Sequence, residues 1–221
     1  MDCFFWRTRL QKKLLCPTLK MIKLLEKLLS SNSCSVTIYY YEEKTCNAFP
    51  FKYSIFLTYT LSKEAIDVTV TIKNEDTKAF PFTLGWHPYF ISENLQASSL
   101  HFKATKKVVF DENLITKNLE DYNNSEVFEI ENKRLDDCFK LKDNTIQFST
   151  PTYQIQLSSN SRETFLQLYT PKNFPVIAIE PMTGISNSFN NKIGLEVLKP
   201  NKKYKLTWNV VFNKRIISDQ E

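Results

Sequence analysis

The chain has 221 residues, 42% hydrophobic and 14% aromatic, which is enough to bury a core without disulfides or metal, and no apolar run is long enough to span a bilayer. The five cysteines are scattered without a C-x-x-C pair, which disfavours a disulfide framework or a zinc site and favours reduced thiols in a cytoplasmic protein. Residues 1–27 hold seven Lys/Arg and two Asp/Glu, which account for the whole net charge of +5, so the remainder is not expected to bind nucleic acid.

Residues 1–30 differ from the rest of the chain. Basic residues interrupt the apolar stretch that a secretory signal needs. Within residues 18–29, an apolar pattern at helical spacing with lysines opposite predicts an amphipathic helix; its members are Met21, Leu25, Leu28 and Leu29. Such a helix packs on its own domain more often than on a membrane surface or a partner. We therefore expect an atypical N-terminal segment at 1–30 and a separate domain at 31–221.

From residue 33 onward the hydrophobic period is two. Apolar and polar residues alternate through 66–72, 153–157, 164–169 and 203–213, which predicts half-buried antiparallel strands. Asparagine-rich pairs such as Asp143-Asn144 are expected to supply turns. No long helical pattern separates the strands, so the pattern predicts an all-β fold, a large antiparallel β-sandwich in a single domain.

His87 is one of only two histidines, and it lies in the segment Phe80-Pro-Phe-Thr-Leu-Gly-Trp-His-Pro-Tyr-Phe90. Imidazole exchanges a proton near neutral pH, and Pro88 biases His87 toward an extended conformation. Aromatic side chains such as the neighbouring Trp86 and Tyr89 can stack on a sugar ring, although most of the chain's aromatic residues must belong to the core. The alternative is a core histidine that hydrogen-bonds a backbone carbonyl.

Two carboxylate positions complete the candidate site. Glu180 ends the apolar strand Val176-Ile-Ala-Ile-Glu180, where partial burial is expected to raise its pKa. The polar loop that follows includes Asn187 and suits hydrogen bonding to a ligand. Asp136 opens an Asp-Asp pair in an apolar setting. The alternatives are a strand-end glutamate paired with a lysine and a turn capped by aspartate.

These segments together resemble the aldose 1-epimerases, the galactose mutarotases and their bacterial relatives. The resemblance covers about residues 33–213 and implies the galactose mutarotase-like supersandwich fold. It is carried by five motifs that recur in the family in this order: Gly85-Trp-His-Pro-Tyr-Phe90, Leu135-Asp-Asp-Cys-Phe139, Leu168-Tyr-Thr-Pro171, Ile179-Glu-Pro-Met-Thr183 and Leu198-Lys-Pro-Asn-Lys-Lys-Tyr204.

The resemblance implies a role for each matching residue. His87 matches the family's general acid, Glu180 its general base, and Asp136 the aspartate that hydrogen-bonds sugar hydroxyls, with Trp86, Tyr89 and Asn187 as further candidate sugar contacts. Such a pair interconverts the α and β anomers of a hexose without metal or cofactor. The implied partner is a small sugar.

The resemblance also has a gap. Family members begin with strands that carry Asn-Arg and His-Gly elements, and this chain has neither element before His87. An N-terminally truncated gene product is the hypothesis that explains this. The resemblance also allows the chain from about Ile22 to be the family's strand leading into Ser35-Val-Thr-Ile-Tyr39, an interpretation that competes with the helix. The alternative functions are a catalytically impaired carbohydrate-binding β-sandwich and a glycosidase that uses Glu180 with Asp136.

Overall fold

The computed structural model describes residues 23–30, 33–42, 49–124, 127–131 and 134–214. Fifteen strands and two short helical segments make up this described part. They are β1 (Lys23–Ser30), β2 (Ser33–Glu42), β3 (Tyr53–Leu61), β4 (Ala65–Asn74), β5 (Phe80–Phe82), β6 (Tyr89–Ile91), η2 (Leu95–Ala97), β7 (Ser99–Phe110), β8 (Thr116–Asn124), β9 (Val127–Glu129), β10 (Asp136–Ser149), β11 (Tyr153–Ser159), β12 (Phe165–Tyr169), β13 (Val176–Met182), α1 (Ser188–Asn191), β14 (Glu196–Leu198) and β15 (Lys203–Lys214).

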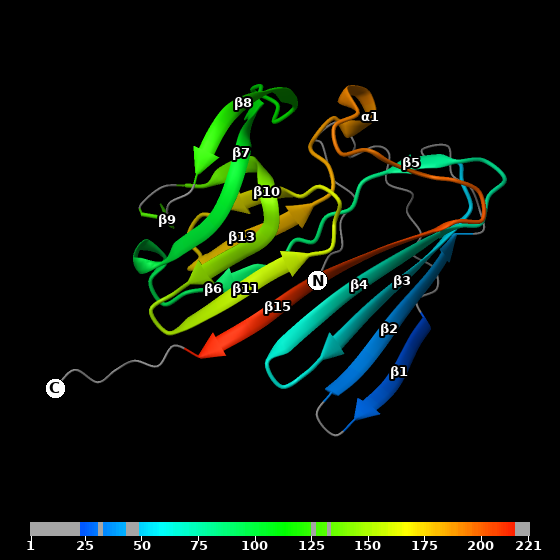
Figure 1. Ribbon diagram of the computed structural model, residues 1–221, viewed down its shortest axis with the longest axis horizontal. Coiled ribbons are helices and arrows are strands. Elements are labelled where there is room, and N and C mark those ends of the chain that lie inside the picture. Colours follow the sequence, from blue (N-terminus) through cyan, green and yellow to red (C-terminus); the bar gives the residue numbers. More distant parts are fainter. Residues whose placement is uncertain (1–22, 31–32, 43–48, 125–126, 132–133, 215–221) are drawn as a thin grey trace.

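One antiparallel sheet dominates the described residues, and it confirms the predicted all-β class. Its order is β1-β2-β3-β4-β15-β11-β10-β12-β13-β6. Outside this order, β7 pairs with β10 and also with β8 and β9. Strands β1 to β4 and β15 lie side by side, whereas β7, β8, β10 and β13 curl into a second, tighter body (Figure 1). Strands β14 and β5 form a separate pair. Among the described residues, no helix is long and apolar enough to cross a membrane.

The first described strand corrects the prediction of an N-terminal helix. Lys23–Ser30 is β1, and it pairs with β2 in an antiparallel register in which Lys23 lies opposite Tyr39. The helical interpretation is therefore wrong for residues 23–29. Residues 18–22, the start of the same pattern, lie outside the described part of the chain. The domain boundary after residue 30 stays a prediction.

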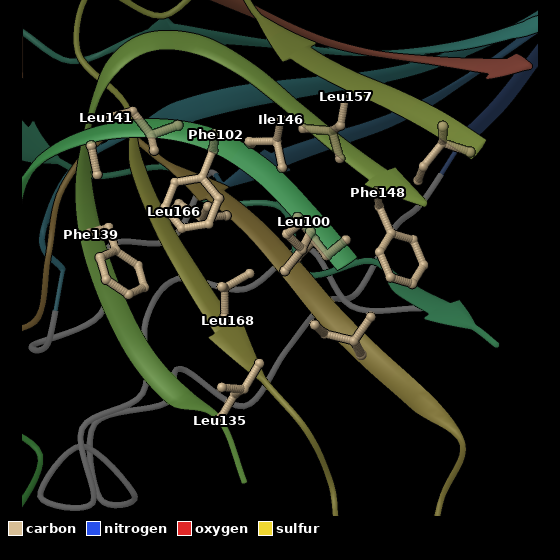
Figure 2. Packing of buried hydrophobic residues seen from close by; sticks show 14 of the residues in the cluster. Leu100, Phe102, Leu135, Phe139, Leu141, Ile146, Phe148, Leu157, Leu166 and Leu168 are labelled. Carbon is tan, nitrogen blue, oxygen red and sulfur yellow. The ribbon is translucent and has the colours of Figure 1, made fainter. Parts of the chain in front are cut away.

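Three hydrophobic clusters fill the described fold. The two larger ones lie under the two parts of the sheet, and the third contains Val108, Cys138, Phe165, Met182 and Ile185. In β4 the burial alternates, because Val68, Val70 and Ile72 face a cluster that also contains Trp208 and Phe80. The larger cluster lies inside the curled part, and Figure 2 shows leucine and phenylalanine side chains from several strands meeting there. Its labelled members are Leu100, Phe102, Leu135, Phe139, Leu141, Ile146, Phe148, Leu157, Leu166 and Leu168.

The long strand β10 links the two parts. It pairs with β12 through residues 136–140 and with β11 through residues 145–149. Its register with β7 shifts between Leu141 and Ile146. The predicted turn at Asp143-Asn144 is therefore wrong, because those residues lie in a bulged stretch of one strand. A bulge bends a strand and increases its twist. This bend lets β10 pair with β12 in the curled part of the sheet and with β11 next to the other part.

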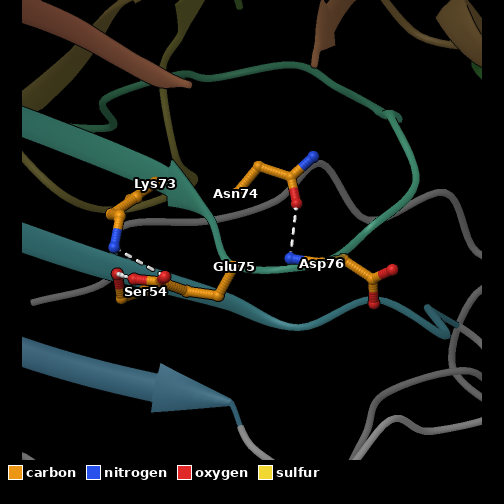
Figure 3. Close-up of polar contacts among 5 residues, drawn as sticks. All are labelled: Ser54, Lys73, Asn74, Glu75 and Asp76. Atoms are coloured by element: carbon orange, nitrogen blue, oxygen red, sulfur yellow. Dashed lines mark hydrogen bonds and ion pairs between the residues drawn. The ribbon is translucent and has the colours of Figure 1, made fainter. Parts of the chain in front are cut away.

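A cluster of hydrogen-bonded polar side chains lies at the end of β4, on the way along the chain to His87. Asn74 is fully buried, and its amide donates to the carbonyls of Lys78 at 2.9 Å and Leu198 at 2.8 Å. Its Oδ1 accepts from the N–H of Asp76, and the Glu75 carboxylate beside it binds Lys73 and Ser54 (Figure 3). These bonds join the end of β4 to β14, the partner of β5.

Candidate active site

The segment that contains His87 runs along β13 in one unbroken antiparallel register. Residues 84–92 pair with residues 175–183, and this register places His87 opposite Glu180. The hydrogen bonds and bridges that fix it join Leu84 with Thr183, Gly85 with Met182, Trp86 with Pro181, Pro88 with Ile179, Tyr89 with Ala178 and Ser92 with Pro175.

Two prolines flank the His87–Glu180 pair. Pro88 and Pro181 lie in the hydrogen-bonded pairs on either side, and each lacks an N–H. Each of those pairs therefore holds one bond, of 3.2 Å and 3.3 Å. His87 and Glu180 occupy the non-hydrogen-bonded position between them, where opposite Cα atoms approach to roughly 4.5 Å. Nε2 of His87 lies 3.1 Å from Oε1 of Glu180.

Glu180 lies inside β13 and not at the strand end that the sequence predicted, because the strand continues through Met182. Every residue from Ile177 to Met182 is buried, so β13 has no solvated face to which a carboxylate could turn. Glu180 is 6% exposed. Loss of hydration raises the pKa of Glu180 to about 8, and the nearby Asp136 carboxyl adds to the shift.

The contact between His87 and Glu180 can hold one proton in two ways, as imidazolium with carboxylate or as imidazole with carboxylic acid. The His87 side chain is 32% exposed, whereas that of Glu180 is 8% exposed. The pair therefore opens to solvent on the histidine side.

A row of side chains crosses the sheet through this pair. Cys138 on β10, Gln167 on β12, Glu180 on β13 and His87 lie opposite one another in turn, so they share one face. We call these four the histidine row. Gln167 is 4% exposed and donates from Nε2 to Oδ1 of Asp136 at 2.8 Å. Its Oε1 is buried, and no group in the described part of the chain donates to it.

The next row contains the aspartate that the sequence singled out. Asp136, Tyr169, Ala178 and Tyr89 lie opposite one another on the same face. Burial raises the pKa of Asp136, and the neighbouring Asp137 adds to this. Ala178 is small and lies between the two tyrosines of this row.

The predicted aromatic contacts fall on two different faces. The Tyr89 ring lies 4.8 Å from the His87 ring, and burial together with the Glu180 charge raises the pKa of Tyr89. Trp86 precedes His87 and therefore points to the other face. It packs against the two larger hydrophobic clusters, with its ring 6.1 Å from that of Trp208. The structure brings Tyr89 to the pair and leaves Trp86 in the core.

Asn187 lies beyond β13, at the start of α1. It adopts a left-handed conformation with φ of 65°, and its Oδ1 accepts from Nδ2 of Asn190 at 2.5 Å. This amide is thus engaged within its own loop. Its role as a sugar contact stays a prediction.

The sequence interpretation did not include Gln167. The pattern of residues 164–169 predicted a strand with one solvated face, but Phe165 to Leu168 are all buried. The available signal was an amide in a run that is otherwise apolar. A buried polar side chain in such a run is more informative than an exposed one.

Chemically, the site offers one acid–base pair with hydrogen-bonding groups beside it. Among the described residues, no group of three or more His, Cys, Asp or Glu side chains is arranged to hold a metal ion. The groups that are present can move a proton and accept hydroxyl hydrogen bonds.

The family profile described as aldose 1-epimerase matches residues 25–210, most of the chain. The chain belongs to the aldose 1-epimerase family. The match includes both members of the His87–Glu180 pair.

Individual relatives share little sequence identity with this chain. The uncharacterized protein YihR of Escherichia coli K12 is 24% identical over 174 residues, which are 73% of this chain and 56% of YihR. This chain therefore spans little more than half the length of that curated relative.

Solved structures show the same fold. The Slr1438 protein of Synechocystis superposes with a TM-score of 0.76 at 21% identity, over 88% of this chain and 66% of that one. The galactose 1-epimerase of Lactobacillus acidophilus gives 0.72 at 17% identity, over 87% and 66%. At these identities the likeness establishes the aldose 1-epimerase fold and no more.

Proposed function

We propose that this chain interconverts the α and β anomers of a free hexose, with Glu180 as general base and His87 as general acid. What supports the proposal most is the direct contact of a buried carboxylate with an imidazole. The C1 hydroxyl and the ring oxygen of a pyranose are bonded to the same carbon. Two adjacent catalytic groups can therefore address both oxygens at once.

The reaction balances with these two groups alone. Glu180 takes the proton of the C1 hydroxyl while His87 gives a proton to the ring oxygen, and the bond between C1 and the ring oxygen breaks to leave an open-chain aldehyde. Rotation about the C1–C2 bond presents the other carbonyl face. Ring closure then reverses both proton transfers.

The groups beside the pair fit a sugar. Asp136 and the free acceptor Oε1 of Gln167 lie on the same face as Glu180 and can accept hydrogen bonds from sugar hydroxyls. Tyr89 offers a half-exposed aromatic face next to His87. A glycosidase requires two carboxyl groups on opposite sides of the scissile bond, and the partner of Glu180 is instead a histidine.

Polarimetry tests the proposal. The purified chain should speed the change in optical rotation of freshly dissolved α-glucose or α-galactose above the buffer rate. Glu180→Gln should lower that enzymatic rate about 100- to 10,000-fold, which is the usual contribution of a general acid or base. Glu163→Gln, an exposed change that also removes one carboxylate, is the matched control.

The contrary outcomes are distinct. Sugar binding without any rate enhancement would identify a catalytically impaired carbohydrate-binding protein. Release of nitrophenol from a nitrophenyl glycoside would identify a glycosidase. Thermal melts of both variants separate a loss of chemistry from a loss of folding.

A further inference from the structure

An apolar groove lies along the outer edge of β6, between this strand and the ends of β11 and β15. It has a volume of about 440 Å³, and its lining residues are Tyr89, Phe90, Ile91, Tyr153 and Phe212. None of these residues is charged, and Ile91 is 64% and Phe212 43% exposed. Exposed apolar residues that gather in one groove indicate a surface that another segment or molecule covers.

The aromatic walls of the groove lie on the face of the sheet that carries Phe148. The rings of Phe90 and Tyr153 each lie 6.2 Å from the Phe148 ring. Phe212 lies opposite Ile155, which in turn lies opposite Phe148, so these three side chains share a face. This is the face of the larger hydrophobic cluster and not that of the histidine row. The proposed reaction therefore does not use the groove.

The main sheet ends at this groove. Among the described strands, β6 pairs only with β13. On the other side of β6, the hydroxyl of Tyr153 at the start of β11 donates to the carbonyl of Ile91. This bond holds the two walls at a fixed separation. Because the bond comes from a side chain and not from strand pairing, the groove between the walls stays open to an apolar segment.

Strand β15 ends at this groove, and the sequence continues beyond it. The last residue of β15, Lys214, lies opposite Tyr153, and Phe212 comes two residues earlier. The sequence goes on with Arg215-Ile-Ile-Ser-Asp-Gln-Glu221. A chain covers at most about 3.6 Å per residue, so both isoleucines stay within about 11 Å of the Cα atom of Lys214. Two branched apolar side chains are therefore tethered within reach of the groove.

The composition of residues 215–221 suits this groove. Ile216 and Ile217 are their only apolar members, and the other five are polar or charged. In an extended chain every second side chain lies on the same side, so position 216 follows Phe212 and position 214. A tethered segment has an effective concentration on the order of 1 mM, so that weak apolar contacts are enough to hold it.

We propose that residues 215–221 dock into this groove of their own chain, with Ile216 packed against Phe212 and Ile91. A second copy of the chain would have to bring an apolar surface of its own, whereas the two isoleucines are already attached beside the groove. The inference does not depend on the proposed function, because the groove and the histidine row lie on opposite faces of the sheet.

Thermal denaturation of the full chain tests the contact by a double-mutant cycle. Ile216→Ser should lower Tm by about 2–4 °C, as expected for the loss of one apolar contact in a chain of this length. In the Phe212→Ala background the same change should lower Tm by no more than about half as much, because the effects of two residues in contact are not additive. Phe212 is exposed and belongs to none of the three hydrophobic clusters, so its removal leaves the core intact.

A matched control separates this contact from a general effect of polar substitution. Val197→Ser makes the same kind of change at a residue of β14 that is 60% exposed and does not line the groove. Its effect on Tm should be equal with and without Phe212→Ala. The Tm of the unchanged chain should also be independent of protein concentration, since the proposed contact lies within one chain.

Two results would overturn the proposal. One is an effect of Ile216→Ser on Tm that is absent, or that is equal in both backgrounds. The other is a Tm that rises with protein concentration, together with a dimer in gel filtration that Phe212→Ala converts to a monomer. A second copy of the chain would then fill the groove.

Discussion

Two rows of polar side chains cross this sheet, and they differ in whether their members satisfy one another. Thr37, Thr58, Thr69 and Thr207 lie opposite one another on β2, β3, β4 and β15, and we call them the threonine row. Their hydroxyls pair at 2.8 Å between Thr37 and Thr58 and at 2.9 Å between Thr69 and Thr207. A hydroxyl both donates and accepts, so each pair is complete without a ligand.

The histidine row has the same cross-strand geometry, but its polar groups do not satisfy one another. The Oε1 of Gln167 is a buried acceptor for which the described residues supply no donor, and the carboxyl of Glu180 has lost most of its hydration. The threonine row is half-buried, with one face of its strands toward solvent. Strands β12 and β13 are buried on both faces. Burial on both sides thus turns an ordinary cross-strand row into a candidate site.

The largest expected effect of this difference is a cost in stability that depends on pH. The folded state holds the pKa of Glu180 at about 8 against an ordinary 4.5. Between these pH values the folded state binds a proton that the unfolded state has released, so the free energy of unfolding falls as pH rises. The full shift corresponds to at most about 5 kcal/mol.

Glu180→Gln removes this titration, so the variant should gain stability relative to wild type as pH rises from 5 to 8. Urea denaturation at both pH values measures the change, with Glu163→Gln as the control. A wild-type stability that does not fall more steeply with pH than that of Glu180→Gln would contradict a desolvated Glu180.

A smaller effect is expected at Gln167, whose buried Oε1 lacks a donor among the described residues and which neighbours Glu180 in the histidine row. Methionine has a similar volume and removes the unsatisfied acceptor, but it also removes the bond from Nε2 to Asp136. The two effects oppose each other, so Gln167→Met should change the free energy of unfolding by no more than about 1 kcal/mol. The same change should weaken sugar binding about tenfold, because a hydroxyl partner is lost. Urea denaturation and calorimetric titration measure the two effects. A less stable variant with unchanged sugar affinity would show that Gln167 serves packing only.

The two rows also mark what the sequence can and cannot predict. The alternation through β4 predicts both its buried valines and its outward threonines, and a carboxylate within an apolar run identifies Glu180. The leucine pairs of residues 24–29 fit a helical period as well as a strand, and only pairing with β2 decides between them. Gln167 was missed because two-sided burial depends on neighbouring strands.

The meeting of His87 with Glu180 is likewise not a local property. It depends on the register between residues 84–92 and β13, and these segments are far apart in the chain. The family resemblance supplied the pairing that periodicity alone could not. Register is fixed by the buried faces of both strands together, so one strand pattern leaves it open.

The smallest effect is expected in the threonine row. Thr69→Val keeps the shape and the strand preference of the side chain and removes one hydroxyl of a half-buried pair. The free energy of unfolding should fall by about 0.5–1 kcal/mol, because the Thr207 hydroxyl can still turn to water. The double variant with Thr207→Val should recover much of that loss, since neither hydroxyl then lacks a partner. Mutarotation should be unchanged in both variants. A loss of rate in polarimetry would show that the threonine row is coupled to the site, and the contrast between satisfied and unsatisfied rows would then fail.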